Sequence, residues 1–380
     1  MKTPLLKSFL AFLVVLAFSV PASATITLYD QDGTTFSTDG SFNTFYVYSD
    51  SDNEIAGTDR QQSRVKMGFL PNWIGFNFSR QAGDLKLGGR SSFWVTINDS
   101  DNNLTETGID VRQFYGTVDA DWGQVLFGKD FTLFNRSNIF LDEIILGYGN
   151  VSDTLGLIDG NGVSFGNIGT GYTYPFPSAQ ITYRTPEYAG FKLAIGVVDP
   201  SRTVAGGEEN LPRLEGELTY KYSFDLGTVN AWVGFLTQSS EDAAGNDADS
   251  NGVSYGVRAA IGSFRAHVSG FTAEGVGFLL GPGADTTLGL PVIEAGDSVD
   301  SDGYLVQASY TIGPARLVAS YGQNELDAST HWENETITGA CFYSVNDYFK
   351  LVAEYNVNTI SIGVPEEETK TIALGAIVTF

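Results

Sequence analysis

Apolar and polar residues alternate along almost the whole chain, and helical periodicity is nearly absent. In the stretch SAQITYR, Ile181 and Tyr183 alternate with polar neighbours such as Thr182. The same period of two recurs in further stretches at residues 191–197, 217–223, 263–269 and 349–356. Because side chains point alternately to the two faces of a strand, this pattern predicts half-buried β-strands from end to end.

The N-terminal stretch differs from the rest of the chain. It carries Lys2 and Lys7, then an apolar run over residues 9–20, then the small residues Ala-Ser-Ala. This layout is typical of a cleaved secretory signal, which predicts a signal peptide at 1–24 and a mature domain at 25–380. An uncleaved N-terminal anchor is the alternative. Beyond this stretch, no apolar run reaches the roughly 18 residues that a membrane-spanning helix needs.

The chain is strongly acidic, with 45 Asp and Glu against 21 Lys and Arg and a formal net charge of −24. This balance argues against nucleic acid as a partner, because no basic patch is present. The single cysteine, Cys341, excludes an internal disulfide framework. A large exported fold without disulfides depends on backbone hydrogen bonds and packing.

The segments between the predicted strands have two sizes. Residues 185–190 and 312–315 are short and contain Gly and Pro, which is typical of tight turns. Residues 237–252 and 279–303 are long, acidic and rich in Gly. Short and long connections along one meander predict a single domain with a plain end and an elaborated end.

Two all-β architectures fit this pattern: a secreted, soluble β-sandwich of the adhesin or lectin type, and a membrane barrel. The polar sides of the strands repeatedly carry Arg, Lys and His, opposite sides rich in Leu, Val, Phe and Tyr. A bilayer admits β-structure only as a closed barrel with an apolar outside and a wet, polar inside. We therefore predict a transmembrane antiparallel β-barrel. At about 22 residues per strand and connection it has about 16 strands, enough to enclose a water-filled channel.

Four stretches carry a family resemblance. Residues 26–53 begin with a Leu-Tyr-x-x-Asp-Gly segment, residues 112–130 contain Arg-Gln, an aromatic and a Gly turn, and residues 178–197 contain a short Pro turn followed by Gly-Phe. The chain ends on Phe380. Together these stretches resemble the trimeric general porins of Gram-negative outer membranes. The resemblance implies a 16-stranded barrel, a homotrimer, and outer-membrane lipid and lipopolysaccharide as its surroundings.

The resemblance also implies that loop 3 folds into the lumen and narrows it. Here loop 3 is the long segment after Lys129, and its acids are Asp142, Glu143, Asp153 and Asp159. In the family such acids face a row of Arg and Lys on the opposite wall, and the transverse field orients polar solutes. An ordinary solvated loop is the alternative for these acids.

Arg112 is the wall cation that the resemblance assigns most directly. The family carries another wall cation on its second strand, and two alignment frames stay open for it. In SRVKMGF this position is Lys66, with Arg64 on the same face, whereas in NWIGF it is Trp73. Alternation alone adds further inward cations: Arg184, Lys192, Lys221, Arg258, Arg265, Arg316 and Lys350. The alternative role for each is to pair with lumen carboxylates or to bind the barrel wall.

The terminal stretch TKTIALGAIVTF alternates up to its last residue. Ile372, Leu374, Val378 and Phe380 fall on one face, which we expect to meet lipid while the strand closes the barrel against the first one. The resemblance adds that Phe380 is part of the signal read by the barrel assembly machinery.

No catalytic or metal-binding motif accompanies this pattern. His267 and His331 lie far apart and lack Cys or carboxylates at ligand spacing, so no metal site is predicted. No phosphate-binding loop and no nucleophile elbow is present, so neither a cofactor nor an enzymatic activity is predicted.

The predicted function is passive diffusion of small hydrophilic solutes and ions across an outer membrane. The acidic balance and a thin row of wall cations lead us to expect weak cation selectivity. A substrate-specific channel of the same fold is the alternative, with Trp73, Trp94 or Trp232 as a sugar-stacking track. A secreted β-sandwich adhesin or lectin is the third interpretation.

Overall fold

The computed structural model describes residues 25–99, 108–159, 164–201, 207–241, 245, 247–282, 289–294 and 296–380. The predicted signal peptide, residues 1–24, lies outside the described residues. The described chain forms one sheet of 18 strands, a separate two-stranded sheet and one short helix, α1 (Arg136–Phe140). No helix in these ranges is long and apolar enough to cross a membrane.

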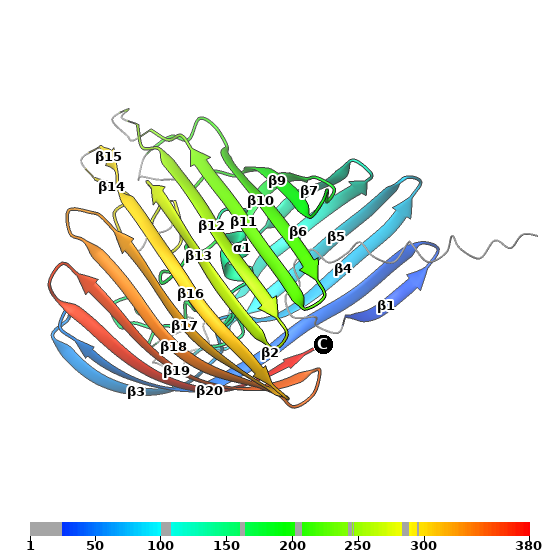
Figure 1. Ribbon diagram of the computed structural model, residues 1–380. Coiled ribbons are helices and arrows are strands. Elements are labelled where there is room, and N and C mark those ends of the chain that lie inside the picture. Colours follow the sequence, from blue (N-terminus) through cyan, green and yellow to red (C-terminus); the bar gives the residue numbers. More distant parts are fainter. Residues whose placement is uncertain are drawn as a thin grey trace, which may run out of the picture.

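The strands of the large sheet follow one another around a ring (Figure 1). In chain order, the strands of both sheets are β1 (Ile26–Gln31), β2 (Thr34–Asn53), β3 (Thr58–Lys66), β4 (Asn72–Ala82), β5 (Leu85–Val95), β6 (Ile109–Ala120), β7 (Gly123–Asp130), β8 (Ser178–Arg184), β9 (Phe191–Val198), β10 (Arg213–Phe224), β11 (Gly227–Gln238), β12 (Ser250–Ile261), β13 (Phe264–Glu274), β14 (Ile293–Glu294), β15 (Asp297–Ser298), β16 (Asp300–Ile312), β17 (Ala315–Leu326), β18 (Trp332–Ser344), β19 (Phe349–Ile362) and β20 (Glu366–Thr379). The strands β14 and β15 form the separate hairpin.

The 18 strands of the large sheet fill 16 positions of a closed antiparallel barrel, because two positions are each shared by two strands. On one side of β2, β20 pairs with residues 41–53 and β1 pairs with residues 34–38, so β20 and β1 lie end to end. On the other side, β3 pairs with residues 45–53 and β4 with residues 34–41. The predicted all-β, 16-stranded barrel is confirmed.

The position shared by β3 and β4 resolves the two frames left open for the second strand. The SRVK of the first frame completes β3 and NWIGF begins β4, and residues 67–71 between them leave the ladder. Asn43 of β2 bridges this gap, because its side-chain amide donates to the carbonyl of Leu70 (2.8 Å). Lys66 and Trp73 are both buried. The two frames are therefore successive halves of one barrel strand.

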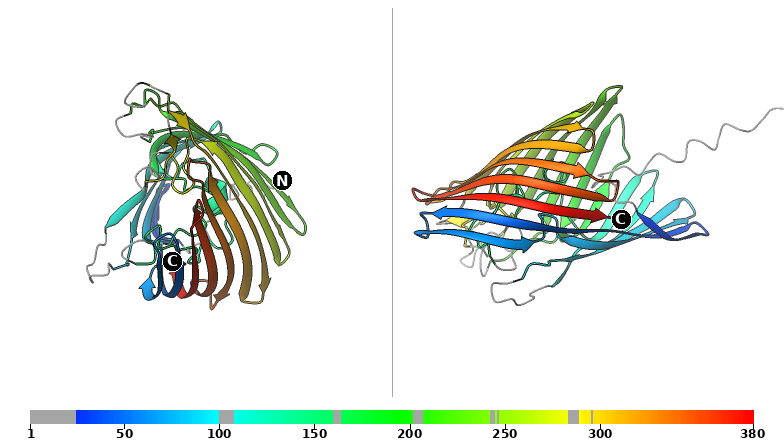
Figure 2. Two further views of the ribbon diagram at one scale, coloured as in Figure 1. Left: turned by 90° about the vertical axis from the view of Figure 1, so that its left-hand side faces the viewer. Right: turned by 90° about the horizontal axis from the view of Figure 1, so that it is seen from below.

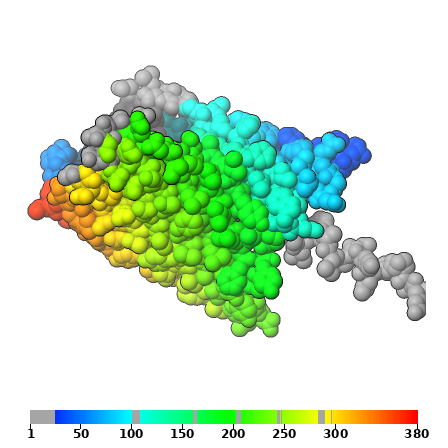
Figure 3. Space-filling model, turned by 90° about the horizontal axis from the view of Figure 1, so that it is seen from above, coloured from blue at the N-terminus to red at the C-terminus, as the bar shows by residue number. Residues whose placement is uncertain are grey.

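Exposure alternates along the strands as the sequence pattern predicts. In β20, Leu374 is 53% exposed and Ala373 is 1% exposed. The exposed positions are mainly apolar, and buried positions of the same strand include polar residues such as Thr369 and Thr371. The space-filling view shows the strands side by side on the outside, in chain order from cyan through green to orange (Figure 3). An apolar outside with polar residues inside is typical of a membrane barrel.

The end of the chain completes the ladder between β20 and β2 (Figure 2). Gly40 donates a backbone hydrogen bond to Phe380 (2.8 Å), and Phe380 donates one to Gly40 (3.0 Å). The ring of Phe380 covers Gly40 and stacks against Phe42, with ring centroids 5.7 Å apart. This seam leaves no free edge between the first and last strands.

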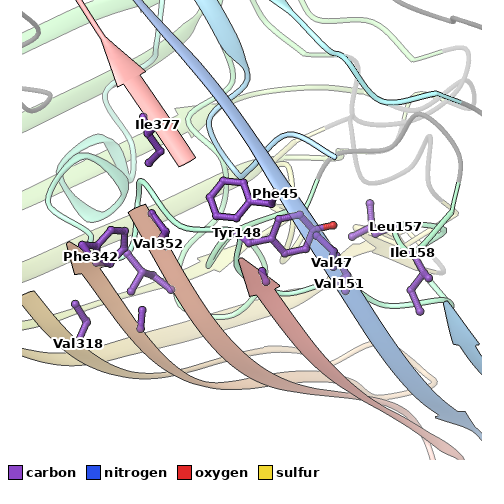
Figure 4. Close-up of a cluster of buried hydrophobic side chains, with 13 residues drawn as sticks. Phe45, Val47, Tyr148, Val151, Leu157, Ile158, Val318, Phe342, Val352 and Ile377 are labelled. Carbon is purple, nitrogen blue, oxygen red and sulfur yellow. The ribbon is translucent and has the colours of Figure 1, made fainter. Parts of the chain in front are cut away.

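Many buried apolar side chains gather where the β7–β8 segment (residues 131–177, of which 160–163 lie outside the described ranges) meets the strands. One cluster joins Tyr148 and Val151 of this segment to Phe45 of β2 and to side chains of β17 through β20 (Figure 4). The rings of Tyr148 and Phe45 lie 5.8 Å apart. The segment is therefore packed firmly against the barrel strands.

The substitution Gly40→Ala is expected to destabilise the seam. A Cβ at this position would lie 2.5 Å from Phe380 Cζ and 2.9 Å from the backbone oxygen of Trp73. Overpacking of this kind costs about 1–3 kcal/mol. Guanidinium unfolding of the purified barrel measures the loss. The matched control is Gly339→Ala, since a Cβ there meets no atom within 4 Å. Equal stability of the two variants would contradict the seam geometry.

Candidate functional site

The β7–β8 segment has little regular structure, yet many of its backbone N–H groups donate to buried side chains of the strands. The contacts are Leu133 N and Phe134 N to Glu215 Oε2 (2.7 and 2.8 Å), Ser137 N to Glu217 Oε1 (3.1 Å), Glu143 N to Gln307 Oε1 (2.8 Å), Tyr148 N and Gly149 N to Glu354 (3.1 and 2.6 Å), Asp153 N and Thr154 N to Glu367 (2.5 and 2.7 Å) and Gly171 N to Asn324 Oδ1 (2.7 Å). A buried backbone donor without a partner is costly, and a carboxylate is a strong acceptor. These side chains of β10, β16, β17, β19 and β20 therefore fix the course of the segment. We call them the wall anchors.

Glu143, one of the four predicted constriction acids, is buried against three arginines. Its carboxylate lies 2.6 Å from Arg258, 3.0 Å from Arg316 and 3.7 Å from Arg265. Ser309 donates a further hydrogen bond to it (3.0 Å). Burial acts to raise the pKa of Glu143, but the neighbouring charges of Arg258 and Arg316 hold this pKa below its usual value. The acid and the wall cations that the sequence predicts on facing walls are thus in direct contact.

Asp142 is fully buried and works as a hydrogen-bond acceptor. Its carboxylate accepts from Gln307 Nε2 (2.6 Å), Tyr172 OH (2.7 Å) and Asn167 Nδ2 (2.9 Å). The backbone N–H of Ile144 adds a fourth hydrogen bond (2.8 Å). Burial raises the pKa of Asp142, although these hydrogen bonds oppose the shift. Asp142 links two parts of the segment to each other and to β16.

Asp153 and Asp159 bind cations of β3. Arg60 forms ion pairs with both carboxylates, and Arg64 lies 3.2 Å from Asp159. Gln62 donates to Asp159 as well (2.7 Å). Arg60 is not among the residues that the sequence analysis singled out. Its spacing of two from Gln62 and four from Arg64 places it on the same strand face, and that spacing is the signal that identifies it.

A cavity of about 610 Å³ lies between the β7–β8 segment and the strands β2 and β4 through β9. The segment contributes mainly apolar and aromatic side chains to its lining, namely Phe131, Ile139, Phe140, Ile145, Phe165, Ile168, Tyr174 and Phe176. Within the described lining, the segment contributes no carboxylate. The four predicted constriction acids therefore have partners away from this cavity, and their role in a constriction stays a prediction.

Cationic side chains dominate the charged part of the cavity. Five of them line it: Arg90, Arg112, Arg136, Arg184 and Lys192. The carboxylates among the described lining residues are Asp39 and Asp130. The formal charge of this lining is therefore positive, although the chain as a whole is strongly acidic.

The cavity cations differ in how far their charge is compensated. Arg90 is held by both carboxylate oxygens of Asp39 (2.6 and 3.0 Å). Asp130 is shared, at 3.2 Å from Arg136 and 3.9 Å from Arg184. Lys192 makes no ion pair within 4 Å in the part of the chain that the structure describes.

Aromatic rings orient two of these cations. The guanidinium carbon of Arg112 lies 5.0 Å from the ring centroid of Trp94 and 5.9 Å from that of Tyr174. Arg112 also donates to the Tyr174 hydroxyl (3.0 Å). The guanidinium of Arg136 lies 5.0 Å from the ring of Phe140. Such cation–π contacts fix the positions of the charges at the cavity surface.

The predicted wall cations divide into two groups. Arg112 and Arg184 line the cavity, as does Lys192, which alternation also placed inward. Five others contact the β7–β8 segment instead: Arg64, Lys66, Arg258, Arg265 and Arg316. Lys221, which is exposed, and Lys350 are not part of the described cavity lining. Lys66, for example, donates from Nζ to the carbonyl of Leu157 (2.9 Å). The role of this second group in the passage of solutes stays a prediction.

Several residues of the interior are not among the predicted site residues. Arg90 follows two glycines in GDLKLGGR, and the weak alternation there hides its inward position. The glutamates among the wall anchors, Glu215, Glu217, Glu354 and Glu367, occupy buried positions of their strands. Their place on the polar face of an alternating strand is the signal that identifies them as interior acids.

The tryptophans proposed as a stacking track lie in two places. Trp73 and Trp94 line the cavity, and their rings stack on each other with centroids 5.0 Å apart. Trp232 instead donates to Asn138 (2.7 Å) and packs against His267. Among the described residues, no group of three or more His, Cys, Asp or Glu is arranged to hold a metal ion. The absence of a metal site stays a prediction.

A closed 16-position barrel with an apolar outside and a charged interior cavity defines a membrane channel protein. A family model described as Gram-negative porin matches residues 10–361. The chain therefore belongs to the Gram-negative porin family and is an outer-membrane porin. The resemblance stated above is confirmed. A search of curated proteins finds no match.

Several solved structures share the fold. The anion-selective porin from Comamonas acidovorans is 14% identical with a TM-score of 0.67, and the match covers 91% of this chain and 100% of that one. The outer membrane channel DcaP of Acinetobacter baumannii is 16% identical with a TM-score of 0.68, covering 93% and 100%. The trimer form of OmpT from Vibrio cholerae is 18% identical with a TM-score of 0.56, covering 92% and 100%. At these identities the similarity concerns the fold alone.

The substitution Glu143→Gln is expected to loosen the β7–β8 segment. Glutamine keeps the shape but leaves three arginines without their shared counter-charge, and breaking a buried ion pair costs about 3 kcal/mol. Urea unfolding followed by tryptophan fluorescence measures the loss. Glu366→Gln, at the exposed start of β20, is the control for removing one carboxylate charge. If both variants unfold at the same urea concentration as the parent, Glu143 does not secure the segment.

Proposed function

We propose that this porin is a passive diffusion channel for small hydrophilic solutes and ions, narrowed by the β7–β8 segment inside the lumen. One observation carries the proposal. The wall anchors hold one side of the segment, and a cavity of about 610 Å³ with charged lining lies on its other side. Barrels of about 16 strands enclose an aqueous channel. A segment fixed across such a channel determines which solutes pass.

The sign of the preferred ion follows from the charges next to the passage rather than from the total. The acidic composition led to the expectation of weak cation selectivity. A pore responds mainly to the charges that line it, and five cations against two carboxylates line the described cavity. The similar structure from Comamonas acidovorans is described as an anion-selective porin. These observations support a modest anion preference, which we propose in place of weak cation selectivity.

Reversal potentials of single channels in a planar bilayer under a KCl gradient test this proposal. Chloride is expected to be more permeant than potassium. Lys192→Glu should shift the permeability ratio toward potassium by roughly threefold, as about 0.6 kcal/mol of charge interaction would. Lys221→Glu makes the same charge change outside the cavity lining and should shift it less. A cation preference of the parent channel, or equal shifts in both variants, contradicts the proposal.

A substrate-specific channel of the same fold is a second candidate, because Trp73 and Trp94 line the cavity. Both rings are buried and stack on each other, which leaves little ring surface for a sugar. Saturable block of conductance by one sugar would favour this candidate. Membership of the porin family excludes the secreted β-sandwich. The family match also supports a channel without enzymatic activity, and that absence stays a prediction.

We further propose a homotrimer embedded in outer-membrane lipid and lipopolysaccharide. The trimer form of the similar OmpT structure supports the oligomeric state. The apolar exposed positions of the strands support the lipid contact. The position of Phe380 at the seam of the barrel supports its proposed role as the signal read by the assembly machinery.

Mild-detergent extraction is expected to yield a trimer that resists SDS until it is heated. Deleting Phe380 should lower the yield of this trimer but leave the conductance of assembled channels unchanged, because Phe380 is not in the cavity lining. Gly40→Ala keeps the terminal aromatic but disturbs its packing and the adjacent backbone of Trp73, so a larger loss in the deletion separates recognition from packing. A normal trimer yield after the deletion refutes the assembly role.

A further inference from the structure

We infer that the cavity selects anions that carry a flat apolar group, such as aromatic carboxylates, over both small anions and neutral aromatic molecules. The inference deepens the proposed channel function and rests on it. Its basis is the unequal chemistry of the two sides of one cavity. Cations and polar groups come mainly from the strands, and apolar rings come mainly from the β7–β8 segment.

The cationic side has charge left over for a solute. Asp39 compensates Arg90 and Asp110 pairs with Arg112 (2.8 Å), whereas the single carboxylate of Asp130 is divided between two arginines. Lys192 has no ion-pair partner within 4 Å among the described residues. A carboxylate that enters the cavity therefore meets uncompensated positive charge, and hydrogen bonds between charged groups are stronger than those between neutral groups.

The apolar side is a run of rings in edge-to-face contact. Phe131 contacts Phe140 and Tyr174 with centroids 5.3 and 6.1 Å apart and nearly perpendicular planes. Tyr174 contacts Phe176 in the same way at 5.6 Å. Phe176 is 48% exposed, so the run ends on an accessible ring. A further aromatic ring extends such a run by the same contacts, which stabilise the bound ring beyond the effect of burial alone.

The two sides of the cavity are in direct contact. Arg112 of the strand side donates to the hydroxyl of Tyr174 on the segment side (3.0 Å), so cationic and aromatic surfaces are adjacent. The cavity volume of about 610 Å³ falls in the range of small-molecule sites. A molecule of the size of benzoate can place its ring on one surface and its carboxylate on the other. Acetate engages only the cations, and benzamide engages only the rings.

The experiment uses the full-length porin in planar bilayers, with chloride current as the baseline. Sodium benzoate is expected to reduce this current in a saturable manner. Sodium acetate and benzamide at the same concentrations should reduce it less. Equal effects of benzoate and acetate, or of benzoate and benzamide, overturn the inference. Conductance steps without benzoate preference leave the proposed channel function intact, whereas the absence of any conductance step refutes that function.

Two variants separate the contributions of ring and charge. Phe176→Ser, at an exposed ring, is expected to weaken benzoate block about fivefold and to leave the effect of acetate unchanged. Lys192→Gln should weaken the effects of both anions. Lys221→Gln removes a cation outside the cavity lining and serves as the matched control. If Phe176→Ser alters benzoate and acetate alike, or Lys192→Gln alters neither, the inference fails.

Discussion

Backbone hydrogen-bonding groups inside a bilayer need partners within the protein, and the rest of this structure follows from that requirement. The strands meet it by forming a closed ring. On each side of β2 the neighbouring position is shared by two strands, so β2 pairs with four strands in all. The β7–β8 segment meets it differently. Many of its N–H groups do not pair with a neighbouring strand, and carboxylates and amides of distant strands accept from them. Both solutions serve one physical need.

The contacts that hold the β7–β8 segment also account for many of the buried carboxylates. Glu215, Glu354 and Glu367 bind backbone donors, and Glu143 binds arginines. These four acids are not part of the described cavity lining. The chain is therefore acidic in total while the described cavity lining is cationic. For this reason the net charge of the chain does not predict the charge of the cavity lining.

The fold can be predicted from short stretches of the sequence, whereas the contacts of the interior join residues that are far apart along the chain. A period of two is visible within seven residues, which is why the strands, their faces and the seam at Phe380 were predictable. The partners of the β7–β8 segment are far away along the chain. Arg258 lies 115 positions from Glu143, and Glu367 lies 213 positions from Thr154. The family resemblance identifies the acids of the segment and predicts that they line the constriction. It does not indicate which strand side chains of this chain bind the segment.

The wall anchors also imply an order in which the contacts of the barrel form during folding. Glu354 and Glu367 belong to β19 and β20, the last two strands of the chain, and they hold residues 148–154 of a segment that precedes them by more than 200 positions. Contacts of such separation form late, since the intervening chain must first be placed. Until the final hairpin is paired, the middle of the segment lacks these partners. A barrel stalled before its last hairpin is therefore open at its seam and also lacks the partners of residues 148–154, so closing the wall and securing this part of the segment are a single step.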